Sequence, residues 1–180
     1  MLTGARVGLR ARHEEDIPIL LTELYEDVAG SARAEGGPWR PVVPWADDPR
    51  LKPDPSNDAV VAFSVVERGS GALIGSATVW GIDTHNRNAH LGLGLVPAAR
   101  GKGYGTEAVA LLCRYGFVVR GLRRLQLETL ADNDAMLRAA ERNGFVREGR
   151  LRSSSWVMGE FLDDVVLGLL AEEWSERTAD

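Results

Sequence analysis

The chain has 180 residues, of which 44% are hydrophobic and 26% charged, and a formal net charge of −5. These values are ordinary for a soluble globular protein and predict one domain spanning residues 1–180. The single cysteine, Cys113, excludes an internal disulfide and a cysteine-based metal cluster, so we expect no metal. No apolar run approaches the roughly 20 residues of a membrane-spanning helix, and no apolar leader opens the chain. We therefore expect a cytoplasmic protein without a membrane partner.

Apolar periodicity predicts strands with a period of two and helices with a period near 3.6. The expected strands are residues 7–11, 59–67, 73–80, a segment ending at 96, 125–129, 145–152 and 156–170. The expected helices run from 14 to 24, from the turn after residue 100 through 119, and from 133 to 143. Residues 36–57 are rich in Pro, Gly and Asp and are predicted to form a long loop.

Charge is distributed unevenly along the chain. Residues 100–152 carry a balance of +5, whereas the segments on either side are acidic. The positive segment favours an anionic ligand. Basic and aromatic residues are not interleaved in it, and no known DNA-binding motif accompanies it, so we expect no nucleic-acid partner.

The most informative segment runs from residue 91 to residue 107. Its first part alternates leucine with glycine, so that one face of the strand is apolar and the other is bare. Its second part is a glycine-rich turn around Lys102 at the start of a helix. Free backbone N–H groups and the helix dipole favour an anion such as a phosphate at such a turn. The spacing differs from the dinucleotide-binding and P-loop patterns, because every second residue is a glycine and Lys102 precedes a glycine.

The sequence R-G-K-G-Y-G-T-E at residues 100–107 resembles the acyl-CoA pyrophosphate loop of the GNAT superfamily of N-acetyltransferases. Asn133, followed by E-R-N-G-F at 141–145 and R-E-G at 147–149, resembles the ribosomal-protein-alanine N-acetyltransferase-like branch of that superfamily. Further residues that fit this branch are Leu9, Arg10, Asp16, Asp164, Glu173 and Trp174. The resemblance therefore covers nearly the whole chain.

The resemblance implies an α+β fold with a single mixed, mostly antiparallel sheet of about seven strands, flanked by about four helices. Two central parallel strands, ending here at Val96 and Thr129, would splay apart so that their unpaired backbone groups bind the pantetheine arm of acetyl-CoA or another acyl-CoA. The residues expected to contact this co-substrate are Leu93, Gly94, Leu95, Arg100, Gly101, Lys102, Gly103, Tyr104, Gly105, Thr106, Asn133 and Arg138. Asn133 serves equally well as a helix N-cap without a ligand, and a solvated helix position is the alternative for Arg138.

For catalysis, the resemblance implies attack of a neutral amine on the thioester, with a backbone N–H near Leu93 stabilising the oxyanion. His90 occupies the position at which many relatives carry a glutamate base, two residues before the first glycine of the strand. An imidazole is a candidate base there, and a packed or surface histidine is the equal alternative. Ala140 and Met136 occupy the positions of the usual tyrosine and serine acids, so the sequence does not identify the group that protonates the leaving thiolate.

The expected function is transfer of an acetyl group to a primary amine, either a protein N-terminal α-amine or a small-molecule amine, in a ternary complex. Trp39 and Trp45, in the variable segment 30–57, are candidates for an aromatic acceptor pocket, with core packing as the alternative. Two other functions stay open: acylation of a lysine or small amine with another acyl-CoA such as succinyl-CoA, and a non-catalytic acyl-CoA sensor. A homodimer is expected by family analogy only.

Overall fold

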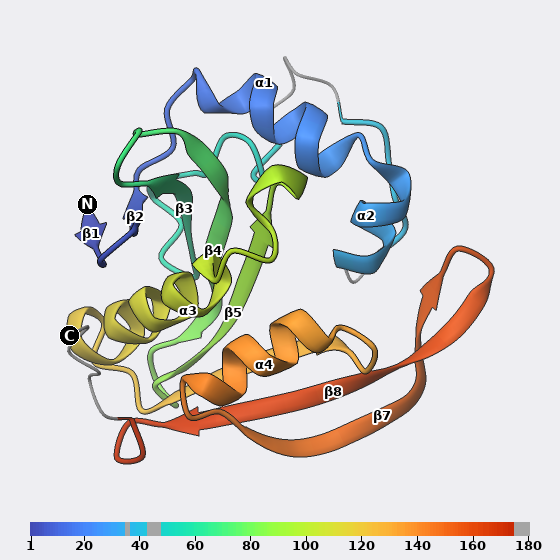
Figure 1. Ribbon diagram of the computed structural model, residues 1–180. Coiled ribbons are helices and arrows are strands. Elements are labelled where there is room, and N and C mark those ends of the chain that lie inside the picture. Colours follow the sequence, from blue (N-terminus) through green and yellow to red (C-terminus); the bar gives the residue numbers. More distant parts are fainter. Residues whose placement is uncertain (35–36, 43–47, 175–180) are drawn as a thin grey trace.

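The computed structural model describes residues 1–34, 37–42 and 48–174. A single sheet with the strand order β1-β2-β3-β4-β5-β6-β8-β7 runs through the molecule (Figure 1). Its strands are β1 (Leu2–Thr3), β2 (Val7–Arg10), β3 (Val60–Glu67), β4 (Leu73–Asp83), β5 (Asn88–Leu95), β6 (Arg124–Leu130), β7 (Val146–Val157) and β8 (Glu160–Leu170). Neighbouring strands are antiparallel except for β5 and β6, which are parallel. The predicted mixed, mostly antiparallel sheet is confirmed.

The sequence predicts about seven strands, and the structure has eight. The additional strand is β1, whose two residues pair with Leu9 and Gly8 of β2. A strand of two residues is too short to show an alternating pattern, so periodicity does not reveal it.

Four α-helices lie within the described ranges: α1 (Asp16–Leu20), α2 (Val28–Ala34), α3 (Tyr104–Arg114) and α4 (Asp134–Arg142). α1 and α3 each continue into a π-helical turn, at Leu21–Tyr25 and Tyr115–Val119. The sequence pattern places no helix at α2, because V-A-G-S-A-R-A contains few large apolar residues. None of the described helices is long and apolar enough to cross a membrane.

The two parallel strands pair over a short distance and then diverge. Asn88 pairs with Arg124, Ala89 with Leu125 and His90 with Gln126. Beyond this point β5 continues to Leu95 along β4, and β6 continues to Leu130 along β8. Figure 1 shows the resulting V, with β4, α1 and α2 on one side and α4, β7 and β8 on the other. The predicted splay is therefore confirmed, and α3 and α4 both begin at its open end.

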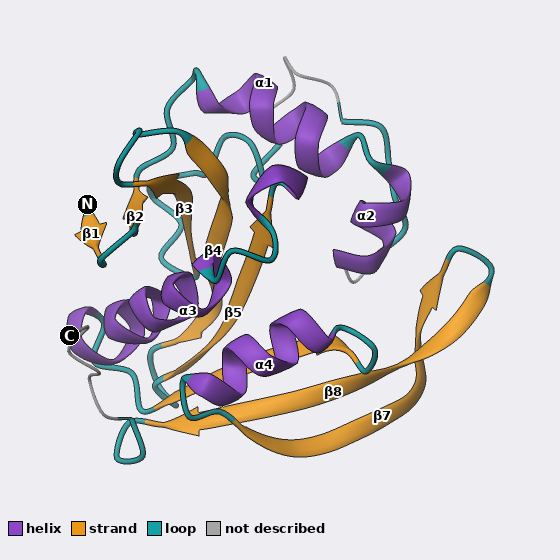
Figure 2. Ribbon diagram, viewed as in Figure 1, coloured by secondary structure: helices purple, strands orange, loops and turns teal. Residues whose placement is uncertain are grey.

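The sheet has one face packed against α3 and α4 (Figure 2). Leu91 of β5 and Leu125 of β6 belong to the buried core on this face, together with Leu112 of α3 and Leu137 of α4. Because side chains alternate along a strand, Gly94 faces the opposite side, where a Cβ atom would lie 3.7 Å from Leu24. The predicted alternation of an apolar and a bare face in β5 is thus confirmed.

The last hairpin turns at a different place from the predicted one. The sequence predicts the turn between residues 152 and 156, but the chain reverses at Met158 and Gly159, both with positive φ. Residues 152–155 instead form a bulge in β7, where the register shifts between Leu151 and Ser155. The hydroxyls of Ser154 and Ser155 donate to Asp164 at 2.6 and 2.5 Å. A run of serines is typical of a turn, which accounts for the wrong prediction of the turn position. Here the serines instead donate to a carboxylate across a bulge.

A buried carboxylate connects the N-terminal segment to the sheet. Asp16, at the start of α1, is 2% exposed and accepts two hydrogen bonds from Arg10 of β2, at 2.6 and 2.8 Å. It also accepts the backbone N–H of His13 and the hydroxyl of Ser64 in β3. Burial raises the pKa of this carboxyl, but the hydrogen bonds and the charge of Arg10 outweigh burial and lower the pKa to about 2.

We expect Asp16→Asn to lower the free energy of unfolding by about 2 kcal/mol at pH 7, because a lowered pKa stabilises the folded carboxylate. That contribution is complete above the unfolded pKa of about 4 and is lost as the pH falls through the folded pKa of about 2. Urea unfolding from pH 7 to pH 2.5, beside the exposed control Asp134→Asn, measures the difference. A deficit that does not shrink below pH 4 would contradict this account.

Cys113 lies in the last turn of α3 and is fully buried. Burial raises the pKa of its thiol to about 12, so the reactive thiolate is scarce at neutral pH. We expect the folded protein to react with a thiol reagent such as dithionitrobenzoate at the rate of global unfolding, and the urea-unfolded chain to react at once. Rapid stoichiometric labelling of the folded protein would be inconsistent with a packed, inert thiol.

Candidate active site

The turn before α3 has a backbone that only glycine adopts readily. Gly101 has φ +74° and Gly103 has φ +82°, which is the left-handed region. Gly103 is the N-cap residue of α3, and no side chain caps the helix there. The first N–H groups of α3 therefore have no side-chain acceptor and, together with the helix dipole, favour an anion at this turn.

Long-range contacts anchor the turn to the N-terminal strands. Arg6 donates from Nη1 to the carbonyl oxygen of Lys102 at 3.0 Å, and its guanidinium lies 5.2 Å from the ring centre of Tyr104. Glu107, in the first turn of α3, accepts the backbone N–H of Arg6 at 2.7 Å. Tyr104 donates its hydroxyl to Glu67, and this hydrogen bond raises the pKa of the tyrosine. Arg6 thus adds a cation beside the turn, whereas Tyr104 is held by Glu67.

Two predicted cations flank the glycines of the turn. Arg100 donates from Nε to the carbonyl oxygen of Leu95 at 2.9 Å, so its side chain lies over the end of β5. Lys102 is exposed. Both side chains are therefore next to the N-terminus of α3, where positive charge adds to the attraction for an anion.

The remaining two predicted turn residues contribute to packing. A Cβ atom on Gly105 would lie 3.7 Å from Leu95 and 3.8 Å from Leu93, so this position faces the apolar side of β5. The carbonyl oxygen of Thr106 accepts a hydrogen bond from Asn143, beyond the end of α4, at 2.9 Å. α3 is thereby held against both β5 and α4, which fixes the direction of its N-terminus.

β5 offers backbone groups to the diverging strands. The N–H of Val96 donates to the carbonyl oxygen of Ile74 in β4, so the backbone groups of Val96 face β4. Because backbone groups alternate sides along a strand, those of Leu93 and Leu95 face the β6 side. Pairing with β6 ends at His90, so β6 does not use these groups, but the carbonyl oxygen of Leu95 already accepts the guanidinium hydrogen bond described above. An extended ligand can therefore pair with both groups of Leu93 and with the N–H of Leu95, as an added strand does.

Asn133, on the opposite leg of the V, is used by the protein itself. Its Oδ1 accepts the N–H of Met136 at 3.3 Å, and its Nδ2 donates to Thr129 at 2.9 Å. The capping role left open by the sequence is thus confirmed. Arg138 is exposed, with Nη1 3.6 Å from Asp134 one helical turn earlier. Contact of either residue with a co-substrate stays a prediction.

His90 lies at the point where β5 and β6 separate. Its ring stacks on Trp80 of β4, with ring centroids 4.3 Å apart and planes 22° apart. Its Nδ1 is buried without a hydrogen-bond partner, and Oε1 of Glu128 in β6 is 3.9 Å away. Two residues along β5, a Cβ atom on Gly92 would lie 2.5 Å from the hydroxyl of Thr78. Polar and aromatic side chains therefore gather on the face of the sheet opposite to α3 and α4.

The positions of the usual acids hold no proton donor. Ala140 is fully buried, and Met136 packs against the same core. Tyr115 packs edge-to-face on Phe63, with ring centroids 5.1 Å apart. Neither Ala140 nor Met136 supplies an acid.

One of the two tryptophans predicted to form an acceptor pocket, Trp39, lies within the described residues. Trp39 is half-buried and donates from Nε1 to the carbonyl oxygen of Tyr25 at 2.9 Å, which fixes its ring beside the π-helical turn after α1. Trp45 lies outside the described residues. The sequence prediction that these two rings form an acceptor pocket stays untested.

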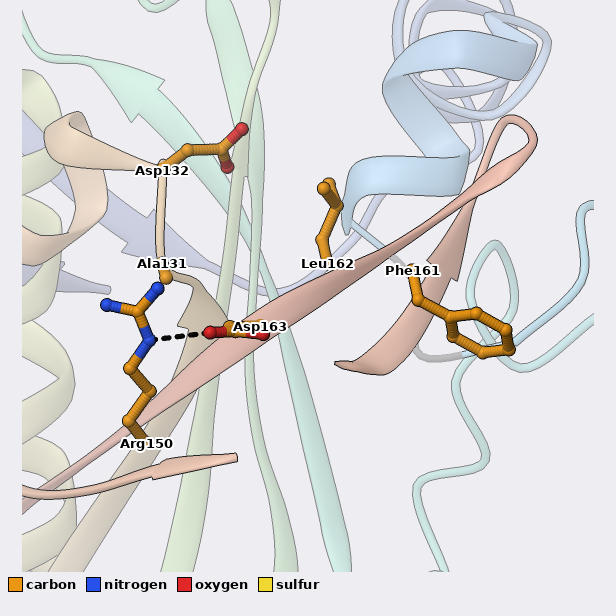
Figure 3. Close-up of a pocket in the computed structure, with 6 residues that line it drawn as sticks. All are labelled: Ala131, Asp132, Arg150, Phe161, Leu162 and Asp163. Carbon is orange, nitrogen blue, oxygen red and sulfur yellow. Dashed lines mark hydrogen bonds and ion pairs between the residues drawn. The ribbon is translucent and has the colours of Figure 1, made fainter. Parts of the chain in front are cut away.

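A pocket of about 340 Å³ lies at the C-terminal end of β6 (Figure 3). Its lining residues are Ala131, Asp132, Arg150, Phe161, Leu162 and Asp163. Arg150 pairs with Asp163 at 2.7 Å, and Asp132 pairs with Arg33 of α2 at 2.6 Å. None of the predicted site residues within the described ranges is among these lining residues.

A glycine turn at the N-terminus of α3, two diverging parallel strands and bare strand positions in β5 occur together here. The family model for the acetyltransferase (GNAT) domain matches residues 6–146. The chain belongs to this family.

Relatives and solved structures agree with the fold of this GNAT domain. The uncharacterized N-acetyltransferase p20 of Bacillus licheniformis is 29% identical over 63% of this chain and 64% of its own length. Spermidine N(1)-acetyltransferase of Vibrio cholerae is 25% identical over 63% of this chain and 66% of its own length. Each match thus covers less than two thirds of the relative. A crystal structure of spermidine N-acetyltransferase from Vibrio cholerae with CoA and spermine superimposes with a TM-score of 0.79, at 21% identity, over 94% of this chain and 98% of the other.

Three residues near the candidate site were not identified from the sequence: Arg6, Thr78 and Glu128. Arg6 reaches it through a contact 96 residues along the chain, and the other two reach it through the pairing of β5 with β4 and β6. The alternation along β6 places Glu128 on the same face as Gln126, beside His90, and this parity is the one signal that could have identified it.

We expect Gly103→Ala to weaken acetyl-CoA binding by about tenfold or more. Alanine is strained in this left-handed backbone and its methyl would lie 3.1 Å from Arg6, so the turn and its cation must shift. The matched control is Gly71→Ala, which has φ +73° with open space around it. Both variants should lose about 1 kcal/mol of stability, and calorimetric titration should separate them. Equal affinity in the two variants would exclude a role for the turn.

Proposed function

We propose that this GNAT domain transfers an acetyl group from acetyl-CoA to a primary amine by direct attack in a ternary complex. The observation that carries the proposal is the end of parallel pairing after His90 and Gln126, with the glycine turn of α3 at the open end of the V. The amine is a protein N-terminal α-amine, as in the branch that the sequence resembles, or a small-molecule amine.

The residues present fit an acyl-CoA. The N–H groups at the start of α3, with Arg6, Arg100 and Lys102 nearby, suit a pyrophosphate. The backbone groups of Leu93 and the N–H of Leu95 suit the amide-bearing pantetheine arm. Acyl-CoA supplies an activated thioester, and the protein contributes binding and orientation.

Different protein groups at the V have different roles in the reaction. The N–H of Leu93 faces the diverging strands and stabilises the negative charge that develops on the thioester oxygen. His90 accepts the proton that the attacking amine loses. The leaving thiolate takes a proton from water, because Ala140 and Met136 occupy the usual positions of the acid.

The surroundings of Gly92 favour an uncharged acyl group. The nearest atoms to a Cβ built there belong to Thr78 and Trp80, and both side chains are neutral. A succinyl carboxylate requires a cation to offset its loss of hydration. We therefore favour acetyl over succinyl.

The face beside His90 suits a cationic amine before it loses its proton. Trp80 is 44% exposed, and Glu128 provides a carboxylate next to it. A ring face and a carboxylate both attract an ammonium group. The Vibrio cholerae relative is a spermidine acetyltransferase, which supports an amine acceptor without identifying the one used here.

A thermal-shift series with acetyl-CoA, succinyl-CoA, free CoA and NAD tests the binding step. At about 100-fold excess over Kd, a ligand stabilises the fold by about 2.7 kcal/mol, which raises Tm by about 5 °C or more. We expect this rise with the CoA compounds and none with NAD. Absence of a rise with every CoA compound would refute the proposal.

Thiol release from acetyl-CoA with peptides bearing a free α-amine, with polyamines and with lysine tests turnover. We expect release that depends on the amine and falls by about 100-fold in His90→Ala. CoA binding without amine-dependent release would favour the sensor.

A further inference from the structure

We propose that Glu128 is a positioning residue for His90: it holds the hydrogen on Nδ1, so that Nε2 is the atom that accepts the amine proton. This inference rests on the proposed acyl transfer for its catalytic meaning, but the tautomer that it assigns to His90 is independent of activity.

The burial of His90 decides which ring nitrogen can act as the base. Nδ1 is buried and has no hydrogen-bond partner among the described residues. A nitrogen closed off in this way cannot receive a proton from a bound amine, so the base must be Nε2. In a neutral imidazole one nitrogen carries the hydrogen and the other the lone pair. Nε2 can therefore accept a proton only if the hydrogen sits on Nδ1.

A hydrogen on buried Nδ1 needs an acceptor, and Glu128 is placed to be one. Its Oε1 is 3.9 Å from Nδ1, about 1 Å more than an ordinary N–H···O hydrogen bond. Catalytic hydrogen bonds are often long before substrate binds and shorten in the reacting complex. Leaving this N–H unpaired would cost more than a small side-chain rotation.

Glu128 is itself oriented by a row of side chains on the same face. Gln126 donates from Nε2 to Oε1 of Glu128 at 2.8 Å. Arg124 donates to Oε1 of Gln126 at 3.0 Å, and pairs with Glu148 of β7 through both terminal nitrogens. The charge of Arg124 is thus offset by Glu148, and the amide of Gln126 presents only its donor to Glu128. The carboxylate of Glu128 is thus directed along β6 toward His90.

The plane of the imidazole ring is fixed from the other side. Trp80 stacks on the ring, and at Gly81 (φ +60°) a Cβ atom would lie 3.2 Å from Cδ2 of His90. The glycine at residue 81 leaves room for the ring edge opposite to Nδ1. The ring therefore lies between β4 and Glu128, with Nδ1 toward the carboxylate.

The reaction balances with this assignment. The amine nitrogen forms the bond to the thioester carbon, and the carbon–sulfur bond breaks to release the thiolate. The proton lost by the amine passes to Nε2 of His90, and the imidazolium is stabilised through its Nδ1–H by the carboxylate of Glu128. His90 then returns the proton to solvent, and the thiolate takes one from water.

Nitrogen-15 NMR of the imidazole tests the tautomer directly in the complete chain, at a pH high enough for a neutral ring. His90→Gln identifies its signals among those of the three histidines. We expect the hydrogen of His90 on Nδ1 in the unaltered protein and a shift of population toward Nε2–H in Glu128→Gln. Glu160→Gln, an exposed substitution in the last hairpin with the same charge change, should leave the tautomer unaltered. A hydrogen on Nε2 in the unaltered protein would overturn the proposal.

A double-mutant cycle tests the catalytic consequence. We expect Glu128→Gln to lower kcat by about tenfold or more with the KM for acetyl-CoA unchanged, and to have no further effect in the His90→Ala background. Equal losses in both backgrounds would mean that Glu128 does not act through His90. Because the NMR result needs no turnover, absence of acyltransferase activity would refute the proposed function while the tautomer assignment is still tested.

Discussion

Parallel pairing between β5 and β6 stops after His90 and Gln126, although β5 continues along β4 and β6 continues along β8. Backbone polar groups are satisfied by hydrogen bonds, so two strands that part inside a sheet leave groups that need another partner. The divergence also directs both helix N-termini toward the same region, because α3 follows β5 and α4 follows β6. The placement of the glycine turn, the free strand edge and the position of His90 are consequences of this one interruption.

Local pattern accounts for most of the fold and about half of the site. The Leu-Gly alternation of β5, the glycine turn and the cap at Asn133 depend on neighbours in sequence, and periodicity and backbone conformation reveal them. Arg6 and Glu128 reach the site through contacts between distant strands, which no local pattern contains. β1 is too short for a period, and the serines of the β7 bulge have the composition of a turn. These failures follow from long-range pairing and short length rather than from unusual residues.

The two faces of the sheet have different tasks. On one face, leucines of β5, β6 and β8 pack against α3 and α4 and form a rigid support. On the other, Trp80, His90, Gln126 and Glu128 carry the polar groups. Because side chains alternate, a polar residue on one face and a core residue on the other are neighbours in the chain, as His90 and Leu91 are. The same packing that stabilises the fold therefore sets the positions of these polar groups.

The ion pair between Arg33 of α2 and Asp132 after β6 spans the wide end of the V. Both side chains are about half exposed, and an exposed pair of this kind contributes about 1 kcal/mol or less in water and is weakened by salt. Breaking it costs little compared with the free energy that holds the core together. The two sides of the V are thus joined firmly where β5 pairs with β6 and only weakly at the wide end. The ion pair between Arg33 and Asp132 therefore adds little resistance to the entry or departure of a long, thin molecule.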